Sequence, residues 1–240
     1  MDIDTLNTAQ RVVEKIESLN DNDAIAECLA TYLCIYGLKH MVVTSLPGPQ
    51  TAAWHKSIAY DSWPEGWLER YNERGHFVHD PCVMHARSAP SPFLWSSVTS
   101  NRLSIPQARV MSEAAEFLLK DGICVPIHLP YQPTWVISAA GPQSHLTQLG
   151  LPAIEMVCVQ AFRALVDTHN ARSEHPTLTY REREVLSWTA AGKSAEDVAC
   201  ILGISRYTVD RHLTNIREKY GAVNTLHAVA KAMANGDIIP

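Results

Sequence analysis

The stretch Lys193–Leu213, with the sequence KSAEDVACILGISRYTVDRHL, predicts two helices joined by a tight turn. Ser194 can cap the first helix together with Asp197 three residues later, the arrangement known as a capping box. Gly203 then supplies the conformational freedom that a tight turn needs. Ser205 can cap the second helix. The stretch therefore predicts a helix-turn-helix.

The second of these helices, which we expect to end near residue 220, has two different faces. Apolar side chains at positions i, i+4, i+7 and i+11 predict its inward face: Val209, Leu213, Ile216 and Tyr220. The opposite face is cationic and hydrogen-bonding: Arg206, Tyr207, Asp210, Arg211, Thr214 and Arg217. The major groove of DNA admits one α-helix, and such side chains suit phosphates and base edges. The helix is thus a candidate recognition helix.

Two further helices complete a small all-α domain. Thr179 and Glu182 form a second capping box, which opens a helix that Gly192 ends. Asn224 can cap a final helix, in which we expect these side chains to point inward: Leu226, Val229, Ala230 and Met233. A helical bundle with solvated faces and no DNA is the alternative. It is disfavoured because caps, turn and polar face agree with one another.

The C-terminal sequence resembles the LuxR-type helix-turn-helix. The matching residues are 178–188 (LTYREREVLSW), 191–193 (AGK), Thr208-Val209, His212-Leu213, Asn215-Ile216 and Lys219. The departures are Thr225, where the family usually has Arg, and Ala222, where it usually has Val. The resemblance implies a homodimer on double-stranded promoter DNA, with RNA polymerase as a further partner. The DNA contacts expected from it and from the exposed face are Lys193, Arg206, Tyr207, Asp210, Arg211, Thr214, Asn215 and Lys219.

The N-terminal part alternates helix and strand signals. Amphipathic helix is predicted over 6–36 with a break near 20–23, and over 152–170. Strands are predicted over 41–46 and 52–58, joined as a hairpin through Pro47-Gly48-Pro49, and over 122–129 and 134–140. Helices before, between and after the strands imply an α/β/α sandwich around an antiparallel sheet. We expect a ligand-binding and dimerisation domain at 1–170, a linker at 171–177, and the four-helix DNA-binding domain at 178–240.

A segment dense in aromatic residues, Trp63–Trp95, is the candidate ligand site. Trp67 and Tyr71 are four residues apart and can share one helix face as an apolar wall with polar tips. Asp80 precedes Pro81, which favours extended backbone at Asp80. Its carboxylate can accept an amide N–H, and an indole N–H can donate to a carbonyl. Core aromatics and an ordinary turn at Asp80 are the alternative interpretation.

The segment also resembles the autoinducer-binding domain of LuxR-type quorum-sensing receptors, on Trp67, Tyr71, Asp80, Pro81, Trp95 and Gly122. The resemblance spans roughly residues 29–165 and implies an N-acyl homoserine lactone as effector and no cofactor. It implies that the Trp67 N–H meets the lactone carbonyl, Asp80 accepts the amide N–H, Tyr71 and Trp95 line the cavity, and Ser138 donates to acyl-chain oxygen. Trp63 stands in the place of a usual Tyr. Asp80→Asn should be milder than Asp80→Ala if the Asn carbonyl still accepts.

Composition limits the class of protein. The net charge of −5 argues against indiscriminate nucleic-acid binding, but residues 177–240 carry eight Lys and Arg against seven Asp and Glu, so the acidity lies upstream. No apolar run is long enough to span a membrane and no signal-peptide pattern is present, so we expect a soluble cytoplasmic protein. The six cysteines stand singly, which favours reduced, packed thiols over disulfides or zinc.

Other functions fit the sequence less well. The cluster of His76, His79, Asp80, Cys82 and His85 has no zinc-type spacing, so no metal is expected. A hydrolase lacks a G-x-S-x-G motif, and we expect no enzyme activity. A response regulator needs an early acidic pair and an Asp at a strand end, which residues 41–46 do not offer. An orphan LuxR-type regulator that answers to a non-lactone molecule, or acts without ligand, stays open.

Overall fold

The computed structural model describes residues 3–46, 54–100, 102–130, 132–142, 146, 150–172 and 178–239, with the side chains of 55, 56 and 166–172 excepted. These residues divide into two compact units. The first is built from 1–129 and 133–172, and the second from 173–240 with the short segment 130–132.

The first unit is organised around a five-stranded antiparallel sheet in the order β2-β1-β5-β4-β3. The strands are β1 (His40–Ser45), β2 (Ile58–Asp61), β3 (Phe93–Leu94), β4 (Asp121–Ile127) and β5 (Trp135–Gly141). In the three central strands, Val42 pairs with Ser138, which pairs with Cys124 on its other side. Side chains of directly paired residues point to the same face of a sheet, so these three share one face.

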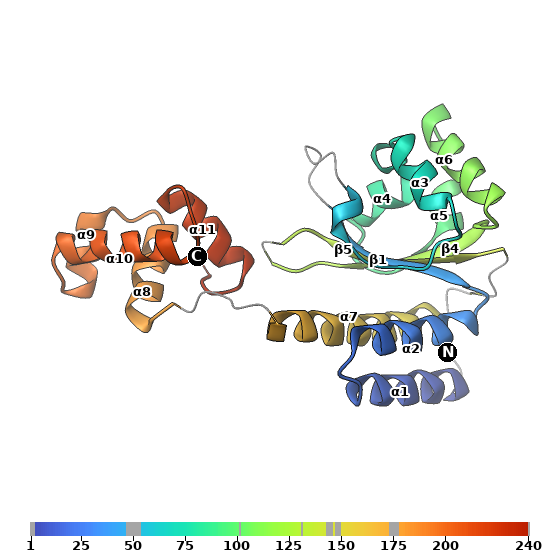
Figure 1. Cartoon of the computed structure of the whole chain (residues 1–240), viewed down its shortest axis with the longest axis horizontal. Helices are drawn as coiled ribbons and strands as arrows, with labels where there is room; N and C mark the ends of the chain where they lie inside the picture. The colour runs from blue at the N-terminus through green and yellow to red at the C-terminus, as the bar shows by residue number, and fades with distance from the viewer. Residues whose placement is uncertain are drawn as a thin grey trace. The chain divides into compact units, whose positions relative to one another are not determined.

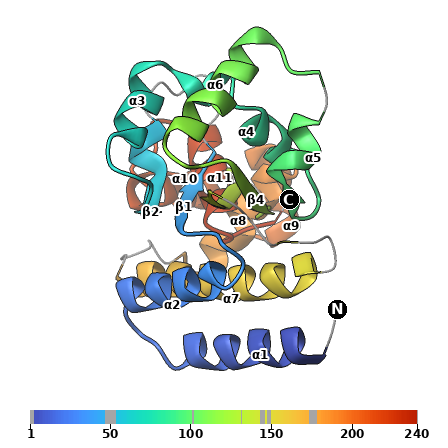
Figure 2. The same cartoon turned by 90° about the vertical axis from the view of Figure 1, so that its right-hand side faces the viewer.

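Helices cover both faces of the sheet, as Figures 1 and 2 show. One side holds α1 (Ile3–Glu17), α2 (Asn22–Cys34) and α7 (Leu151–Arg172); the other holds α3 (Trp67–Glu73), α4 (Pro81–Ala86), α5 (Trp95–Thr99) and α6 (Ile105–Glu116). Each side has its own apolar core. The predicted α/β/α sandwich is therefore confirmed, and the aromatic segment belongs to the side of α3–α6.

The structure differs from the predicted elements in places. Residues Trp54–Ser57 form a 3-10 helix, and β2 begins only at Ile58, so a strand over 52–58 was wrong. The predicted turn at 47–49 lies outside the described residues. Helix α7 continues to Arg172, so the first two residues of the expected linker are helical, and the other five, 173–177, are outside the described residues.

The second unit contains four helices among its described residues: α8 (Tyr180–Ala190), α9 (Ala195–Leu202), α10 (Arg206–Lys219) and α11 (Thr225–Ala234). Both capping boxes are formed, at Thr179 and at Ser194. Ser205 and Asn224 cap α10 and α11. Gly203 has a φ of 64°, a left-handed conformation that Gly adopts without steric cost. The predicted helix-turn-helix is confirmed.

The inward face of α11 was predicted correctly for Val229, which is buried, and Met233, which packs against the core, but wrongly for Leu226 and Ala230. Leu226 is 77% exposed and Ala230 is exposed, whereas Ala228, Val229 and Ala232 are buried. The small alanines lie in the core shared with α8 and α10. Close approach of α11 to its neighbours, rather than side-chain size, therefore decides which face is buried.

Two expectations from composition can be compared with the structure. All six cysteines are free, and four are buried, but Cys34 and Cys200 are exposed, contrary to the packed thiols expected. Among the described helices, none has both the length and the apolar character needed to cross a bilayer.

Candidate functional site

A cavity lies between the sheet and helices α3–α6 of the first unit. It encloses about 640 Å³ of space between atoms, including the part open to solvent. Its floor is the sheet face that carries Val42, Cys124 and Ser138. All six residues expected to bind ligand line this one cavity: Trp63, Trp67, Tyr71, Asp80, Trp95 and Ser138.

Asp80 stands at the N-terminus of α4 and is held by three hydrogen bonds. Its Oδ1 accepts from the backbone N–H groups of Cys82 at 2.8 Å and Val83 at 3.2 Å, which makes it the N-cap of the helix. Its Oδ2 accepts the Tyr71 hydroxyl at 2.9 Å. A carboxylate has about four lone-pair sites. Asp80 therefore keeps roughly one acceptor site, on Oδ2, for a further donor.

Burial raises the pKa of Asp80, although the hydrogen bonds from Tyr71, Val83 and Cys82 and the nearby His76 act against this. Burial, followed by the neighbouring Asp80 charge, also raises the pKa of Tyr71. Tyr71 therefore stays a neutral donor to Asp80 at physiological pH. The pair presents a fixed acceptor to the cavity, and an amide N–H is a group that such an acceptor can bind.

Aromatic rings form part of the cavity wall near Asp80. Trp67 is edge-on to Tyr71, with ring centroids 5.6 Å apart. Trp63 lies against Trp95 at 6.3 Å. Trp67 and Trp95 are buried and Trp63 is half-buried. Such rings supply a large apolar surface with a few donors at their edges.

Sequence reasoning missed Trp54, which also lines the cavity. Its ring stacks on Phe77 at 5.5 Å and lies 5.0 Å from Tyr71. Placing this residue in a hairpin strand separated it from the aromatic segment that begins at Trp63. The signal was a fourth Trp shortly before that segment.

Ser138 belongs to the sheet floor, and its hydroxyl lies 3.4 Å from the Cys124 sulfur. Either atom can donate in this contact. A Ser hydroxyl has one donor and two lone pairs, so this weak contact leaves Ser138 with further hydrogen-bonding capacity toward the cavity.

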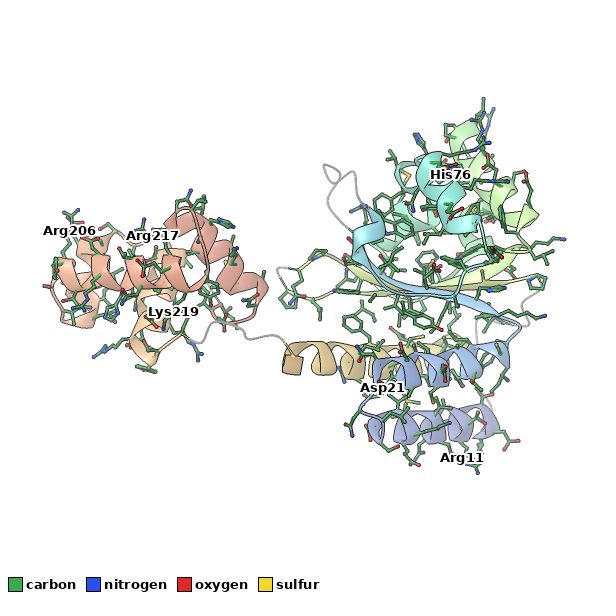
Figure 3. All side chains as sticks on the ribbon, in the orientation of Figure 1. Arg11, Asp21, His76, Arg206, Arg217 and Lys219 are labelled. Carbon is green, nitrogen blue, oxygen red and sulfur yellow. The ribbon has the colours of Figure 1, made fainter. Side chains whose placement is uncertain are left out.

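Behind the cavity wall, on the side away from the sheet, lies a buried polar pair. His76 Nε2 is 3.0 Å from Glu113 Oε2, and Arg74 reaches the other oxygen of Glu113 at 3.3 Å. The His76 ring packs 5.9 Å from Trp67 and 5.6 Å from Tyr71. Figure 3 shows His76 beside α3, among the helices on that side of the sheet. The pair therefore supports two wall residues from outside the cavity.

The potential metal ligands have other partners. Asp80 caps α4, and His76 is bonded to Glu113. Within the described part of the chain, no group of three or more His, Cys, Asp or Glu is arranged to hold a metal ion.

In the second unit, α10 buries the side that was predicted to face inward. Val209, Ile216 and Tyr220 are buried and Leu213 is partly buried. The expected DNA-contacting residues are all exposed positions: Lys193, Arg206, Tyr207, Asp210, Arg211, Thr214, Asn215 and Lys219. The part of α10 that does not face the core is therefore mostly polar, and Lys193 stands just before α9.

Several of these side chains already have protein partners. Arg206 pairs with Glu196 of α9, and its Nε lies 3.7 Å from Asp210. Thr214 donates to the Asp210 carbonyl at 3.0 Å. These are exposed contacts, and exposed ion pairs contribute little to stability. Arg206 can therefore exchange Glu196 for a phosphate at small cost.

Lys219 differs from the others. Its Nζ donates to Glu182 Oε2 at 2.6 Å, and Glu182 is buried. Lys219, together with the Thr179 cap, lowers the pKa of Glu182, although burial acts the other way. In Figure 3, Lys219 lies on the side of α10 nearest α8, opposite Arg206 and Arg217. Lys219 therefore ties α10 to α8 in addition to any contact with DNA.

Comparison with known proteins assigns both units. A model described as an autoinducer binding domain matches residues 21–165, and one described as bacterial regulatory proteins of the luxR family matches 176–232. The chain belongs to the LuxR family. It is a quorum-sensing transcription regulator with an autoinducer-binding first unit and a DNA-binding second unit.

Relatives match along most of this LuxR-family chain. Transcriptional activator protein BjaR1 of Bradyrhizobium diazoefficiens is 34% identical over 212 residues, 85% of each chain. The quorum sensing-dependent regulator RpaR of Rhodopseudomonas palustris is 32% identical over 232 residues, 95% of this chain and 93% of its own. The crystal structure of Escherichia coli SdiA matches with a TM-score of 0.77 over 98% of this chain and 99% of its own. At 19% sequence identity, this match shows a similar fold and nothing more.

Proposed function

We propose that the effector of this regulator is an N-acyl homoserine lactone, held in the cavity of the first unit. The observation that carries the proposal is the one open acceptor site on Asp80, inside a cavity lined mostly by apolar and aromatic side chains. An amide N–H satisfies this site, and the apolar wall suits an acyl chain. Effectors of other chemistry need an equivalent donor at the same place.

Within this proposal each cavity residue has a role. The amide N–H donates to Asp80 Oδ2, and the Trp67 indole N–H donates to the lactone carbonyl. Tyr71 holds the Asp80 carboxylate through the hydrogen bond at 2.9 Å and, with Trp63 and Trp95, forms part of the cavity wall. The assignments rest on the shared cavity and on the resemblance to the family's receptors. Ser138 donates to acyl-chain oxygen when the Cys124 thiol is the donor in the contact between these two side chains.

Ligand binding is coupled to folding in this account. An eight-carbon chain that leaves water contributes about 0.8 kcal/mol per buried CH₂, and the sum is comparable with the whole stability of a typical domain. The effector therefore completes the core on the α3–α6 side of the sheet. We infer that the filled unit forms a homodimer and acts in the cytoplasm.

The second unit then binds a promoter through α10 in the major groove. We assign base contacts to Asp210, Arg211 and Thr214, because they occupy the exposed centre of α10. Lys193 and Arg206 are assigned to phosphates, Tyr207 and Asn215 flank them, and Lys219 adds charge while it holds Glu182. A homodimer offers two such helices to a palindromic site, where RNA polymerase is the further partner.

The test is mass spectrometry of small molecules extracted from protein that was expressed with and without a panel of lactones. We expect one lactone to co-purify in an amount close to that of the protein, and Asp80→Ala to retain much less of it. Stable, active protein that carries no lactone from any member of the panel would contradict the proposal. It would favour the orphan regulator with a non-lactone effector, or with none.

A further inference from the structure

The first unit has a second hollow, a cleft beside α6. It holds about 580 Å³ of space between atoms, including the part open to solvent, and it shares no lining residue with the cavity described above. Four of its six lining residues are Arg or His, and none of the six is acidic. The six are Arg74, His76, His79, Ile105, Pro106 and Arg109. The cleft is therefore a separate site with a basic lining.

This basic lining lies in an acidic part of the chain. Residues 1–176 carry twelve Lys and Arg against eighteen Asp and Glu. The Arg and His side chains of the cleft come from the C-terminal end of α3, the 3-10 helix His76–Val78 with the residue after it, and the first two turns of α6. Like charges that the fold brings together repel one another. An anion bound among them would relieve this repulsion.

The protein neutralises only part of this charge. Glu113 Oε1 lies 3.3 Å from Arg74, and Glu113 Oε2 lies 3.0 Å from His76. Glu113 is buried and does not line the cleft. Among the described residues, Arg109 and His79 form no ion pair, and both are exposed. The cleft therefore keeps at least one guanidinium without a counter-charge.

His76 connects the cleft with the wall of the first cavity. It lines the cleft, and its ring packs on Trp67 and Tyr71, which line that cavity. Its label in Figure 3 marks this position beside α3. A ligand in the cleft would therefore touch a ring that supports the aromatic wall from outside.

The lining indicates which anion fits. A guanidinium offers its N–H groups in a planar fork that matches the oxygens of a phosphate or a carboxylate. A phosphate monoester carries about −1.5 to −2 charges at pH 7 and three acceptor oxygens, so it uses two Arg and two His more fully than a carboxylate does. Ile105, which is 81% exposed, and Pro106 add apolar surface to the same cleft. This surface favours a phosphate that is attached to an apolar or aromatic group.

We propose that the cleft is a second ligand site, which binds a small phosphate monoester through Arg74, His79 and Arg109. The phosphate lies between the two guanidiniums, and the group attached to it packs against Ile105 and Pro106. This ligand does not compete for the first cavity, where the Asp80 carboxylate would repel an anion. The chain thus has two sites that take ligands of different chemistry.

The test is a titration of the ¹⁵N-labelled full chain with phenyl phosphate, followed by NMR through the backbone amide signals of residues 74–79 and 107–109. We expect saturable shifts of these signals. The affinity should be about tenfold higher than for inorganic phosphate or for benzoate, equivalent to about 1.4 kcal/mol. Inorganic phosphate lacks the apolar group and benzoate lacks the phosphate, so the two probes test the two halves of the ligand separately.

Arg109→Gln should weaken the binding of phenyl phosphate about tenfold. This side chain is exposed and forms no ion pair, so its replacement leaves the fold intact. Arg102→Gln is the matched control, because it removes an exposed Arg from the segment before α6 that does not line the cleft. It should leave the affinity unchanged.

The exposed arginines of α10 give an internal reference for non-specific contact with an anion, through the amide signals of residues 206–217. Three results would each overturn the proposal. They are cleft signals that need as much phenyl phosphate as those of α10, an equal affinity for inorganic phosphate or benzoate, and equal losses in Arg109→Gln and Arg102→Gln. No lactone enters these measurements, so their outcome is independent of the function proposed above.

Discussion

Asp80→Asn should separate ligand recognition from folding. In the wild-type chain, Oδ1 caps α4 and Oδ2 faces Tyr71 and the cavity. The single carbonyl oxygen of Asn is a good N-cap and will be used by the backbone N–H groups of α4. The amide nitrogen then takes the place of Oδ2 and presents a donor to the ligand N–H. The structure therefore revises the expectation that Asn would be a mild substitution.

The size of the effect follows from the lost hydrogen bond. A ligand amide left unpaired in a dry cavity costs about 1–3 kcal/mol, which corresponds to a response roughly five- to 150-fold weaker. Asp80→Ala should weaken the response to a similar extent but also lose the cap, at about 1 kcal/mol of stability. It also leaves the Tyr71 hydroxyl without its acceptor. Only the Ala variant should therefore destabilise the ligand-free chain.

The assay pairs two measurements on each variant, the lactone dose response of a reporter promoter and the urea denaturation midpoint of the ligand-free protein. We predict that Asp80→Asn does not lower the midpoint but loses the response, whereas Asp80→Ala loses both. A normal dose response in Asp80→Asn would refute the reasoning about the occupied carbonyl. A normal response in both variants would remove Asp80 from the ligand site.

Three further predictions concern stability and DNA binding. Burial raises the folded-state pKa of Asp80 above its ordinary value of about 3.8. The wild-type chain should therefore lose stability relative to Asp80→Asn as the pH rises from about 3.8 through that raised pKa. A difference in urea midpoint between the two proteins that does not change with pH would contradict this prediction. Gly122→Ala places a Cβ 2.5 Å from a backbone carbonyl oxygen and should lower the free energy of unfolding by about 1–3 kcal/mol. In the control variant Gly150→Ala, the added Cβ has no neighbour closer than 3.9 Å, so this variant should melt near the wild-type temperature. Arg211→Ala should cost about 1–3 kcal/mol of DNA-binding free energy at the cognate site alone. Lys193→Ala should weaken binding to every duplex and reduce the slope of log affinity against log salt concentration by about one. Identical losses of affinity for the two variants, measured by fluorescence anisotropy, would reject the two roles.

The second unit was the more predictable from sequence, because its signals are local. A cap at Ser194, a left-handed Gly203 and a cap at Ser205 each fix the backbone within a few residues. Where the outcome depended on packing between helices, the pattern misled. Leu226 suggested an inward face by its size, but α11 packs through Ala228 and Ala232.

The cavity was predictable only in part. Trp67, Tyr71 and Asp80 lie close in sequence, and the resemblance to known receptors joined them to Trp95 and Ser138 on distant elements. Trp54 was not predicted as a cavity residue because apolar alternation near it indicated a strand, whereas the chain forms a 3-10 helix there. Helix α6, which supplies Val110, Met111 and Ala114 to the wall, was not predicted at all. Polar residues interrupt its apolar positions because one side of the helix faces solvent, so only its packing in the fold reveals its role.

The group that binds the open acceptor site on Asp80 is best identified in a crystal structure of the full chain bound to an N-acyl homoserine lactone. We predict that the ligand amide nitrogen lies about 2.7–3.2 Å from Asp80 Oδ2, with the hydrogen bond from Tyr71 to the same oxygen intact. A ligand bound outside this cavity, or one inside it whose amide makes no contact with Asp80, would contradict the account.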